Sequence, residues 1–312
     1  MDLENRREMT APGPFEARYL AFLGTIANLR PSLHRYCSRM TGSVLDGEDV
    51  VQEALFQAYR MLDSFDDSRP LTPWLFRIAH NLCIDALRRR GVRVDAEQSA
   101  PIEEAVQPAE PAGPAVGRAL EQLVSTLPPK ERACVLLKDV FDYSLEEIAE
   151  LVDSTVGGVK AALNRGRGKL SAASGEPVTR ARPPVSAETR ELLRLYCERF
   201  NRHDWDGVRE LVSADARLLF ANGYAGRLAD APYFSKYETV PERWRMLAAD
   251  VDGEPVIVRY AWDDSTWRPA SIIRIEISGD RVVRICDYYW CPWVLPAATT
   301  VSLSPPAPRS GT

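Results

Sequence analysis

The sequence lacks the residue patterns of metal sites, secreted proteins and membrane spans. Its six cysteines form no C-x-x-C pair and only three histidines accompany them, so no metal site is expected. No apolar core of a signal sequence is present, and no run of about 18 apolar residues occurs. We therefore expect a cytoplasmic protein with free thiols, no cofactor and no membrane contact.

The chain also lacks the overall positive charge that is typical of nucleic-acid-binding proteins. Its formal net charge is −5, and residues 1–95 carry 13 cations and 13 acids. Residues 96–117 carry four acids, four prolines and no cation. Any basic surface must therefore be local. At 312 residues, the chain has the length of two or three domains of about 100 to 150 residues each.

A helix-turn-helix is predicted between Ser144 and Leu170. Ser144 and Glu147 have the spacing of a capping box, and Thr155 can cap a second helix after a polar break. The segment from Thr155 to Leu170 carries four cations and no acid, which suits a helix that enters the major groove of DNA. The alternative is a basic helix that only faces solvent.

Helical periodicity also dominates residues 15–95. The pattern predicts a helix that breaks at Pro31, a helix after Asp46, and a helix from Thr72 that ends in three arginines at Arg90. This part of the chain is therefore expected to be a helical bundle.

Three segments together resemble the extracytoplasmic-function (ECF) group of bacterial RNA polymerase sigma factors. They are DGEDVVQEALFQAYRMLDSFD, LTPWLFRIAHNLCIDALRRR and LPPKERACVLLKDVFDYS, the last of which leads into the helix-turn-helix. The resemblance implies two helical domains, region 2 and region 4, that bind core RNA polymerase and promoter DNA. It also implies an anti-sigma factor as a further partner and no enzymatic activity.

The resemblance assigns roles to individual side chains. Contacts with core polymerase are implied for Asp46, Glu48, Asp49, Gln52 and Glu53. Contacts with the −10 promoter element, including capture of a flipped base, are implied for Asp66, Asp67, Arg69, Asn81, Asp85, Arg88 and Arg89. Contacts with the −35 element are implied for Thr155, Lys160, Asn164, Arg165, Arg167 and Lys169. Without the resemblance, the acids after Asp46 would be read as a solvated helix face.

Three residues of the second helix depart from the family pattern. They are Gly158, Ala162 and Gly166. Each glycine costs about 1 kcal/mol of helix stability relative to alanine, and an alanine in place of an arginine removes a phosphate contact. We therefore expect a weaker or differently specific −35 contact.

The chain continues for 142 residues after Leu170. Its last part has helical patterns followed by GEPVIVRYAWDD, RPASIIRIEISGD and RVVRICDYYWCPWV, which are rich in β-branched and aromatic residues. This order predicts an α+β roll with a curved antiparallel sheet. The segment FNRHDWDGVRELVSADARLLF resembles SnoaL-like domains of the nuclear-transport-factor-like superfamily, which implies a cone-shaped pocket. Candidate pocket residues are Tyr224, Arg259, Trp262, Arg274, Asp287 and Tyr289.

The expected protein is multidomain, with two all-α sigma domains before the α+β roll. The expected boundaries are 15–95 for region 2, 96–117 for a flexible linker, 118–172 for region 4, 173–186 for a second linker, 187–295 for the roll and 296–312 for a disordered tail.

The predicted function is a sigma factor that is regulated in cis by an intramolecular contact with its C-terminal domain. The alternatives are a helix-turn-helix regulator without sigma activity, and an enzyme with its site in the roll. Asp287 is the candidate acid–base group, but a lone carboxylate is more often paired with a cation such as Arg274. A structural or regulatory role for the roll is therefore favoured over catalysis.

Overall fold

The computed structural model describes residues 14–66, 68–97, 123, 126–172, 185–220, 225–298 and 300–303. None of the helices in these ranges is long and apolar enough to cross a membrane.

Three long helices form the N-terminal bundle: α1 (Pro14–Thr41), α2 (Val44–Arg60) and α3 (Leu71–Glu97), with the short 3-10 helix η1 (Leu62–Ser64) between the last two. The Ser43 hydroxyl caps α2 by accepting a hydrogen bond from the Asp46 amide at 3.2 Å. Helix α1 continues through Pro31, so the predicted break is wrong. Proline removes one backbone donor, and the complete burial of Leu33 and Tyr36 beyond it shows how tightly the second half is packed.

A second group of helices contains the helix-turn-helix. It consists of α5 (Pro129–Asp139), α6 (Leu145–Leu151) and α7 (Val156–Ala172). The capping box of Ser144 and Glu147 is confirmed at the start of α6. The cap at Thr155 is also confirmed, because its hydroxyl accepts a hydrogen bond from the Gly158 amide at 3.0 Å.

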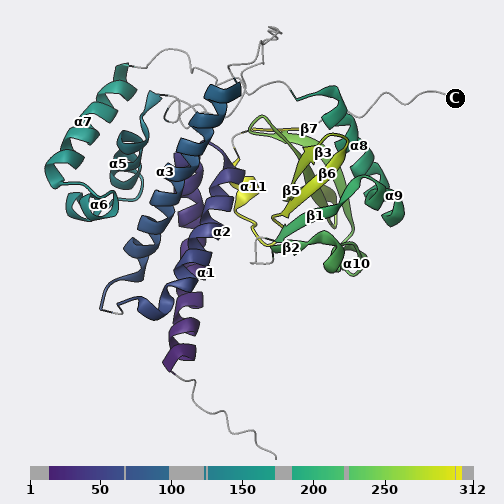
Figure 1. Ribbon diagram of the computed structural model, residues 1–312, viewed down its shortest axis with the longest axis horizontal. Helices are drawn as coiled ribbons and strands as arrows, with labels where there is room; N and C mark the ends of the chain where they lie inside the picture. The colour runs from purple at the N-terminus through teal and green to yellow at the C-terminus, as the bar shows by residue number, and fades with distance from the viewer. Residues whose placement is uncertain are drawn as a thin grey trace, which may run out of the picture.

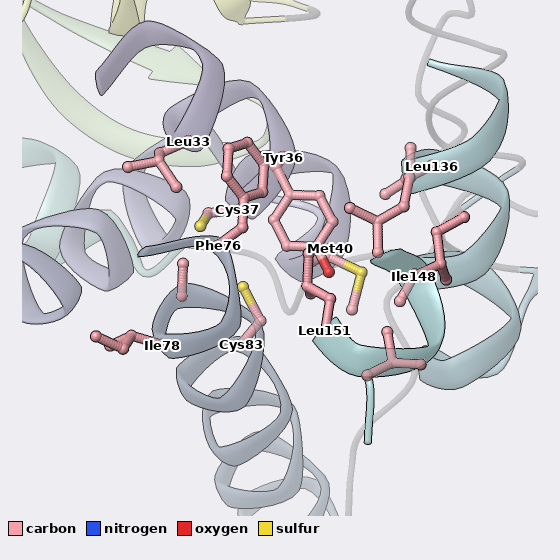
Figure 2. Close-up of a cluster of buried hydrophobic side chains, with 14 of the residues drawn as sticks. Leu33, Tyr36, Cys37, Met40, Phe76, Ile78, Cys83, Leu136, Ile148 and Leu151 are labelled. Carbon is pink, nitrogen blue, oxygen red and sulfur yellow. The ribbon is translucent and has the colours of Figure 1, made fainter. Parts of the chain in front are cut away.

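The two helical groups share one hydrophobic core. Figure 2 shows Tyr36 and Met40 of α1 near Leu136 of α5 and Ile148 of α6. The Phe141 ring lies 5.9 Å from the Tyr36 ring and packs against α3 as well. These contacts dock the helix-turn-helix against the N-terminal bundle.

The C-terminal part is an α+β unit, as predicted. Its helices are α8 (Ala187–Asn201), α9 (Trp205–Glu210), η2 (Leu228–Asp230), α10 (Tyr233–Glu238) and α11 (Val294–Ala297). Its strands are β1 (Val212–Phe220), β2 (Ala225–Arg227), β3 (Trp244–Val251), β4 (Glu254–Asp263), β5 (Thr266–Ser278), β6 (Arg281–Asp287) and β7 (Val301–Leu303). They form one sheet in the order β2-β1-β6-β5-β4-β3-β7.

The sheet is mostly antiparallel, as predicted, with one parallel pair. Strands β1 and β6 pair in parallel, and the other neighbours pair antiparallel. A parallel pair needs a long crossover connection, and the chain between β1 and β6 supplies it because it contains α10 and four strands, β2 to β5.

The two faces of the sheet are covered by different parts of the chain. On the inner face, Ile257 and Ile273 pack with Phe200 of α8 and Tyr237 of α10. On the outer face, buried residues such as Val258 pack with residues of α2. Figure 1 shows the consequence: the long helices stand in the middle, α5 to α7 lie on one side of them, and the sheet lies on the other.

Candidate functional site

The first two turns of α2 lie against the outer face of the C-terminal sheet. The Arg274 guanidinium of β5 contacts Asp46 Oδ1 and Asp49 Oδ2, each at 3.0 Å, and Glu254 Oε1 at 2.5 Å. The Tyr288 hydroxyl donates to Asp49 Oδ1 at 2.8 Å. Two of the acids predicted to contact polymerase are therefore bound by the chain's own C-terminal unit.

Glu48 is the most deeply buried acid of this surface, with a relative exposure of 0%. Its carboxylate accepts hydrogen bonds from Arg30 Nη2 at 2.7 Å, Trp293 Nε1 at 2.9 Å and the Cys291 thiol at 3.3 Å. A buried carboxylate requires such donors, because the loss of water is otherwise too costly. Glu48 therefore joins α1, α2 and the segment before α11 in one polar cluster.

Apolar contacts surround these polar groups. Val44 and Leu45 at the start of α2 are buried in one cluster with Val256, Val258 and Ile272 of the sheet. Figure 1 shows α11 between α2 and the sheet, and α11 contacts both α2 and β5. The contact between α2 and the C-terminal unit thus has an apolar centre as well as ionic partners.

Burial changes the acid–base properties of this contact. Loss of water raises the pKa of Asp49 to about 6, although Arg274 and Tyr288 act in the opposite direction. Burial also raises the pKa of the Cys291 thiol, so this residue is a neutral donor to Glu48.

The remaining predicted polymerase residues lie outside this contact. Gln52 is half-buried, and Glu53 is exposed and accepts a hydrogen bond from Gln57 of the same helix at 2.8 Å. The predicted surface is therefore divided into a covered part (Asp46, Glu48 and Asp49) and an open part.

The residues predicted to contact −10 DNA from α3 form one exposed face. Asn81, Asp85 and Arg88 are spaced by four and three residues, and Arg89 is exposed beside them. Asp85 pairs with Arg88 at 3.6 Å. This face is open to a partner in the described structure.

The loop before α3 holds the rest of the −10 set. Asp66 Oδ1 accepts hydrogen bonds from the Ser68 amide at 3.0 Å and the Ser68 hydroxyl at 2.7 Å. Arg69 lies 3.9 Å from Asp66, and both side chains are exposed. Asp67 lies outside the described residues.

Three of the six predicted −35 residues border a groove of about 410 Å³ between α5, α6 and α7. Lys160, Asn164 and Arg167 line it together with Lys138 at the end of α5. Lys138 could not be predicted from the sequence, because its position beside α7 depends on how α5 packs. The groove brings three cations together, which suits an anionic partner such as a DNA backbone.

Three of the four cations of α7 are paired with acids of α5. Arg165 and Lys169 contact Glu131 at 2.9 and 2.8 Å, and Arg167 pairs with Asp139. The ion pairs with Lys169 and Arg165 hold the pKa of Glu131 below its ordinary value. The Arg167–Asp139 pair is exposed on both sides, so it is weak and can exchange for another anion, whereas Glu131 is only 8% exposed.

Two of the unusual residues of α7 face the protein interior. Ala162 is fully buried, and a Cβ atom on Gly166 would lie 3.0 Å from Val135 Cγ2 of α5. These positions therefore serve the close packing of α7 on α5. The idea that an arginine is missing from the DNA-facing side at position 162 is wrong.

Part of the predicted pocket set does gather on the inner face of the sheet. Asp287 accepts hydrogen bonds from the Tyr237 hydroxyl at 2.6 Å and the Tyr289 amide at 2.9 Å. Arg259 pairs with Glu242 at 2.9 Å, and its guanidinium lies 4.5 Å from the Tyr289 ring centre. Burial raises the pKa of Asp287.

Other members of the predicted pocket set lie elsewhere. In the register of β5 and β6, Ile273 is opposite Asp287 and Arg274 is opposite Cys286, so Arg274 faces the outer side. Arg274 therefore neither lines the pocket nor pairs with Asp287, contrary to expectation. Trp262 packs on Trp267 at 5.4 Å. Tyr224 lies outside the described residues.

The residues that cover α2 were not predicted from the sequence. Tyr288, Cys291 and Trp293 belong to the aromatic segment DYYWCPW, which was read as strand and pocket. Its aromatic density was the only signal, and it did not indicate a partner. No sequence pattern around Arg30 indicated that it would bind Glu48.

Comparisons with known proteins agree with the helical geometry. Residues 25–93 match the model of Sigma-70 region 2, and residues 117–170 match that of Sigma-70, region 4. The ECF RNA polymerase sigma factor SigW of Bacillus subtilis is 34% identical over 162 residues, which cover 48% of this chain and 87% of SigW.

The match to one mycobacterial sigma factor extends into the C-terminal unit. The ECF RNA polymerase sigma factor SigG of Mycobacterium tuberculosis is 27% identical over 324 residues, which cover 92% of this chain and 86% of SigG. The crystal structure of the M. tuberculosis extracytoplasmic function sigma factor SigJ aligns with 85% of this chain and 95% of its own, at 18% identity and a TM-score of 0.33. On the strength of the region 2 and region 4 matches and the identity to SigW, the chain belongs to the ECF family of RNA polymerase sigma factors.

Proposed function

We propose that this sigma factor binds core RNA polymerase through α2, contacts promoter DNA through α3 and α7, and is inhibited in cis by its C-terminal unit. One observation carries the inhibition: Arg274 and Tyr288 bind Asp46 and Asp49, which the family resemblance assigns to polymerase contact. A polymerase surface and the C-terminal sheet cannot occupy these carboxylates at the same time.

Each helical group is assigned its own binding role. Region 2 is assigned to residues 15–95, with polymerase contacts on α2 and −10 contacts on the exposed face of α3. Region 4 is assigned to residues 118–172, with −35 contacts on α7. The regulatory unit begins with α8 at Ala187 and includes α11 and β7, so it extends to Leu303, beyond the predicted end at residue 295. A polymerase subunit works in the cytoplasm, where the six buried cysteines stay reduced.

The docking of region 4 on region 2 supports an inactive state. Promoter positions −35 and −10 are separated by about 85 Å of B-form DNA at 3.4 Å per base pair. A compact unit of about 150 residues has a diameter of only about 40 Å. Regions joined through one hydrophobic core are therefore too close to contact both elements, so promoter binding requires their separation.

We also propose a regulatory rather than an enzymatic role for the C-terminal unit. Asp287 is 1% exposed and is held by Tyr237 and the Tyr289 amide, which leaves little access for a substrate. General acid–base catalysis requires a group that reaches its substrate. The outer face of the same sheet, in contrast, is engaged with α2.

The test compares the full chain with a version that ends after Ala172, in polymerase binding and in transcription from a cognate promoter. The buried core of the helical part contains only residues before Ala172, which supports folding of the shortened chain. We expect the shortened chain to bind core polymerase at least about tenfold more tightly, because the competitor for α2 is gone. Circular dichroism checks its fold.

Two results would contradict the proposal in different ways. Absence of polymerase binding by both versions would contradict the assignment of α2. Equal affinity of both versions would contradict inhibition in cis while leaving the polymerase contact intact.

A further inference from the structure

The polymerase-facing side of α2 is a continuous stripe that is only half covered. Residues 46, 49, 53, 56 and 60 follow one another at spacings of three and four, so their side chains lie along one side of the helix. Arg274 and Tyr288 cover the first two positions. Beyond them, Glu53 and Arg60 are exposed, and Phe56 is 56% exposed.

Building on the proposed function, we propose that core polymerase lands first on the open half of this stripe and from there displaces the C-terminal unit. The open half is continuous with the covered half, so one partner surface can follow the helix from one to the other. The partner that fits the landing surface has an apolar contact for Phe56 and a cation for Glu53. The C-terminal unit offers the same chemistry to the covered half, with apolar strands around Arg274.

Opening without a partner is unfavourable for physical reasons. It would expose Val44 and Leu45 together with the apolar outer face of the sheet. It would also leave Arg274 separated from two of its three carboxylates. The spontaneous opening rate is therefore expected to be low.

The acids of α2 become more deeply buried with distance from the landing surface, which favours displacement from the open side. Asp49, next to the landing surface, keeps 34% of its side chain exposed, and Asp46 keeps 21%. Glu48, further inside, is completely buried. The partly hydrated ionic contacts can exchange before the buried centre opens.

A partner bound at the landing surface also gains a concentration advantage. Once Phe56 and Glu53 are engaged, the partner competes for Asp49 at an effective concentration on the order of millimolar. Competition of this kind becomes faster as more polymerase is supplied. Spontaneous opening, in contrast, proceeds at a rate that polymerase cannot change.

The experiment compares two rates on the full chain. Cys291 is buried between Glu48 and Arg30, so its labelling by excess small thiol reagent reports spontaneous opening, with Cys291→Ser to identify the signal. Stopped-flow fluorescence reports association with core polymerase over rising concentrations. We expect the association rate to exceed the Cys291 labelling rate and to keep rising.

Two variants test the parts of the proposal. Phe56→Ala is expected to lower the association rate about tenfold without changing Cys291 labelling, since an exposed aromatic anchor is lost. Leu23→Ala removes another exposed apolar side chain, on α1, and is expected to change neither rate.

Arg274→Gln is expected to raise the Cys291 labelling rate by about tenfold to 100-fold, because a shared ionic partner is removed. Arg268→Gln is its matched control on the same strand, where Arg268 pairs with Asp263 away from α2. Equal effects of these two variants would contradict the role given to Arg274.

An association rate that levels off at the Cys291 labelling rate would overturn displacement from the landing surface. In that case spontaneous opening would limit the rate of polymerase binding, and the proposed function would still stand. Absence of association even for Arg274→Gln would instead contradict the proposed function itself.

Discussion

Helices α2 and α7 both carry charged surfaces that we propose bind macromolecular partners, and each is already engaged within the chain. The acids of α2 are bound by residues far away in sequence: Asp49 contacts Arg274, 225 positions later. The cations of α7 are bound by acids of the adjacent α5, such as Glu131. Glu48 on α2 is completely buried, whereas Arg165 on α7 is 57% exposed.

This difference determines how each surface becomes available. The Arg167–Asp139 pair is exposed on both sides, and such a pair is worth less than about 1 kcal/mol, so a phosphate can replace Asp139 by simple side-chain rotation. A buried network with apolar surroundings opens only when a whole domain moves. Access to α2 is therefore controlled by domain position, and access to α7 by local competition.

Glu48→Ala is the change with the largest expected effect on this comparison. It leaves Arg30 and the Trp293 indole without their acceptor, so the free energy of unfolding should fall by about 3 to 5 kcal/mol. Chemical denaturation followed by fluorescence measures it. Glu53→Ala, on the exposed side of the same helix, should cost less than about 0.5 kcal/mol. A similar loss of unfolding free energy for both variants would show that the buried cluster stabilises the protein no more than an exposed position does.

Lys160→Ala tests the open nature of the α7 surface and should have a smaller effect. Lys160 lines the groove and has no ion pair within the described residues. Loss of one phosphate contact should weaken binding to all DNA sequences about threefold and reduce the salt slope by about 1. Titrations at several salt concentrations measure both quantities. Lys130→Ala on α5, outside the groove, serves as control, and a loss confined to one promoter sequence would indicate base contact instead.

A change in pH should have the smallest effect, and only on the α2 contact. Asp49 has a pKa of about 6 when covered, above the ordinary value of 3.8, so the covered state binds more protons between these values. Lowering the pH through 6 should therefore favour the covered state, and raising it should favour release. The effect should stay below about tenfold, because 34% of the side chain is exposed and water screens its charge.

The charged groups around Asp49 define the control for this experiment. Arg274, Tyr288, Asp46 and Arg284 all act on its carboxyl group. Fluorescence transfer between dyes at Ser64→Cys and Ser265→Cys reports the position of the C-terminal unit. Asp49→Asn should flatten the pH dependence between 5 and 7. An unchanged pH dependence in this variant would assign the titration to another group.

Much of the helical half was predictable because its signals are local. The capping box at Ser144 and the cap at Thr155 depend on residues three positions apart, and both formed as expected. Pro31 was misjudged because a local rule was opposed by packing, with Leu33 and Tyr36 buried in the core. The parallel pair of β1 and β6 was missed because pairing between distant strands leaves no local pattern.

The site was predictable only where it is made of one element. The sequence by itself determined the stripe of acids on α2 and the cations on α7, because helical spacing decides which side chains share a face. Alternation along β5 likewise determined that Arg274 and Ile273 point to opposite faces.

What each face meets was decided by the tertiary structure alone. Only the docking of the sheet brought Arg274 to Asp46 and Asp49, and only the packing of α5 brought Glu131 to the cations of α7. A period of two or of 3.6 residues identifies the faces of an element, but it contains no information on the partner that will bury them.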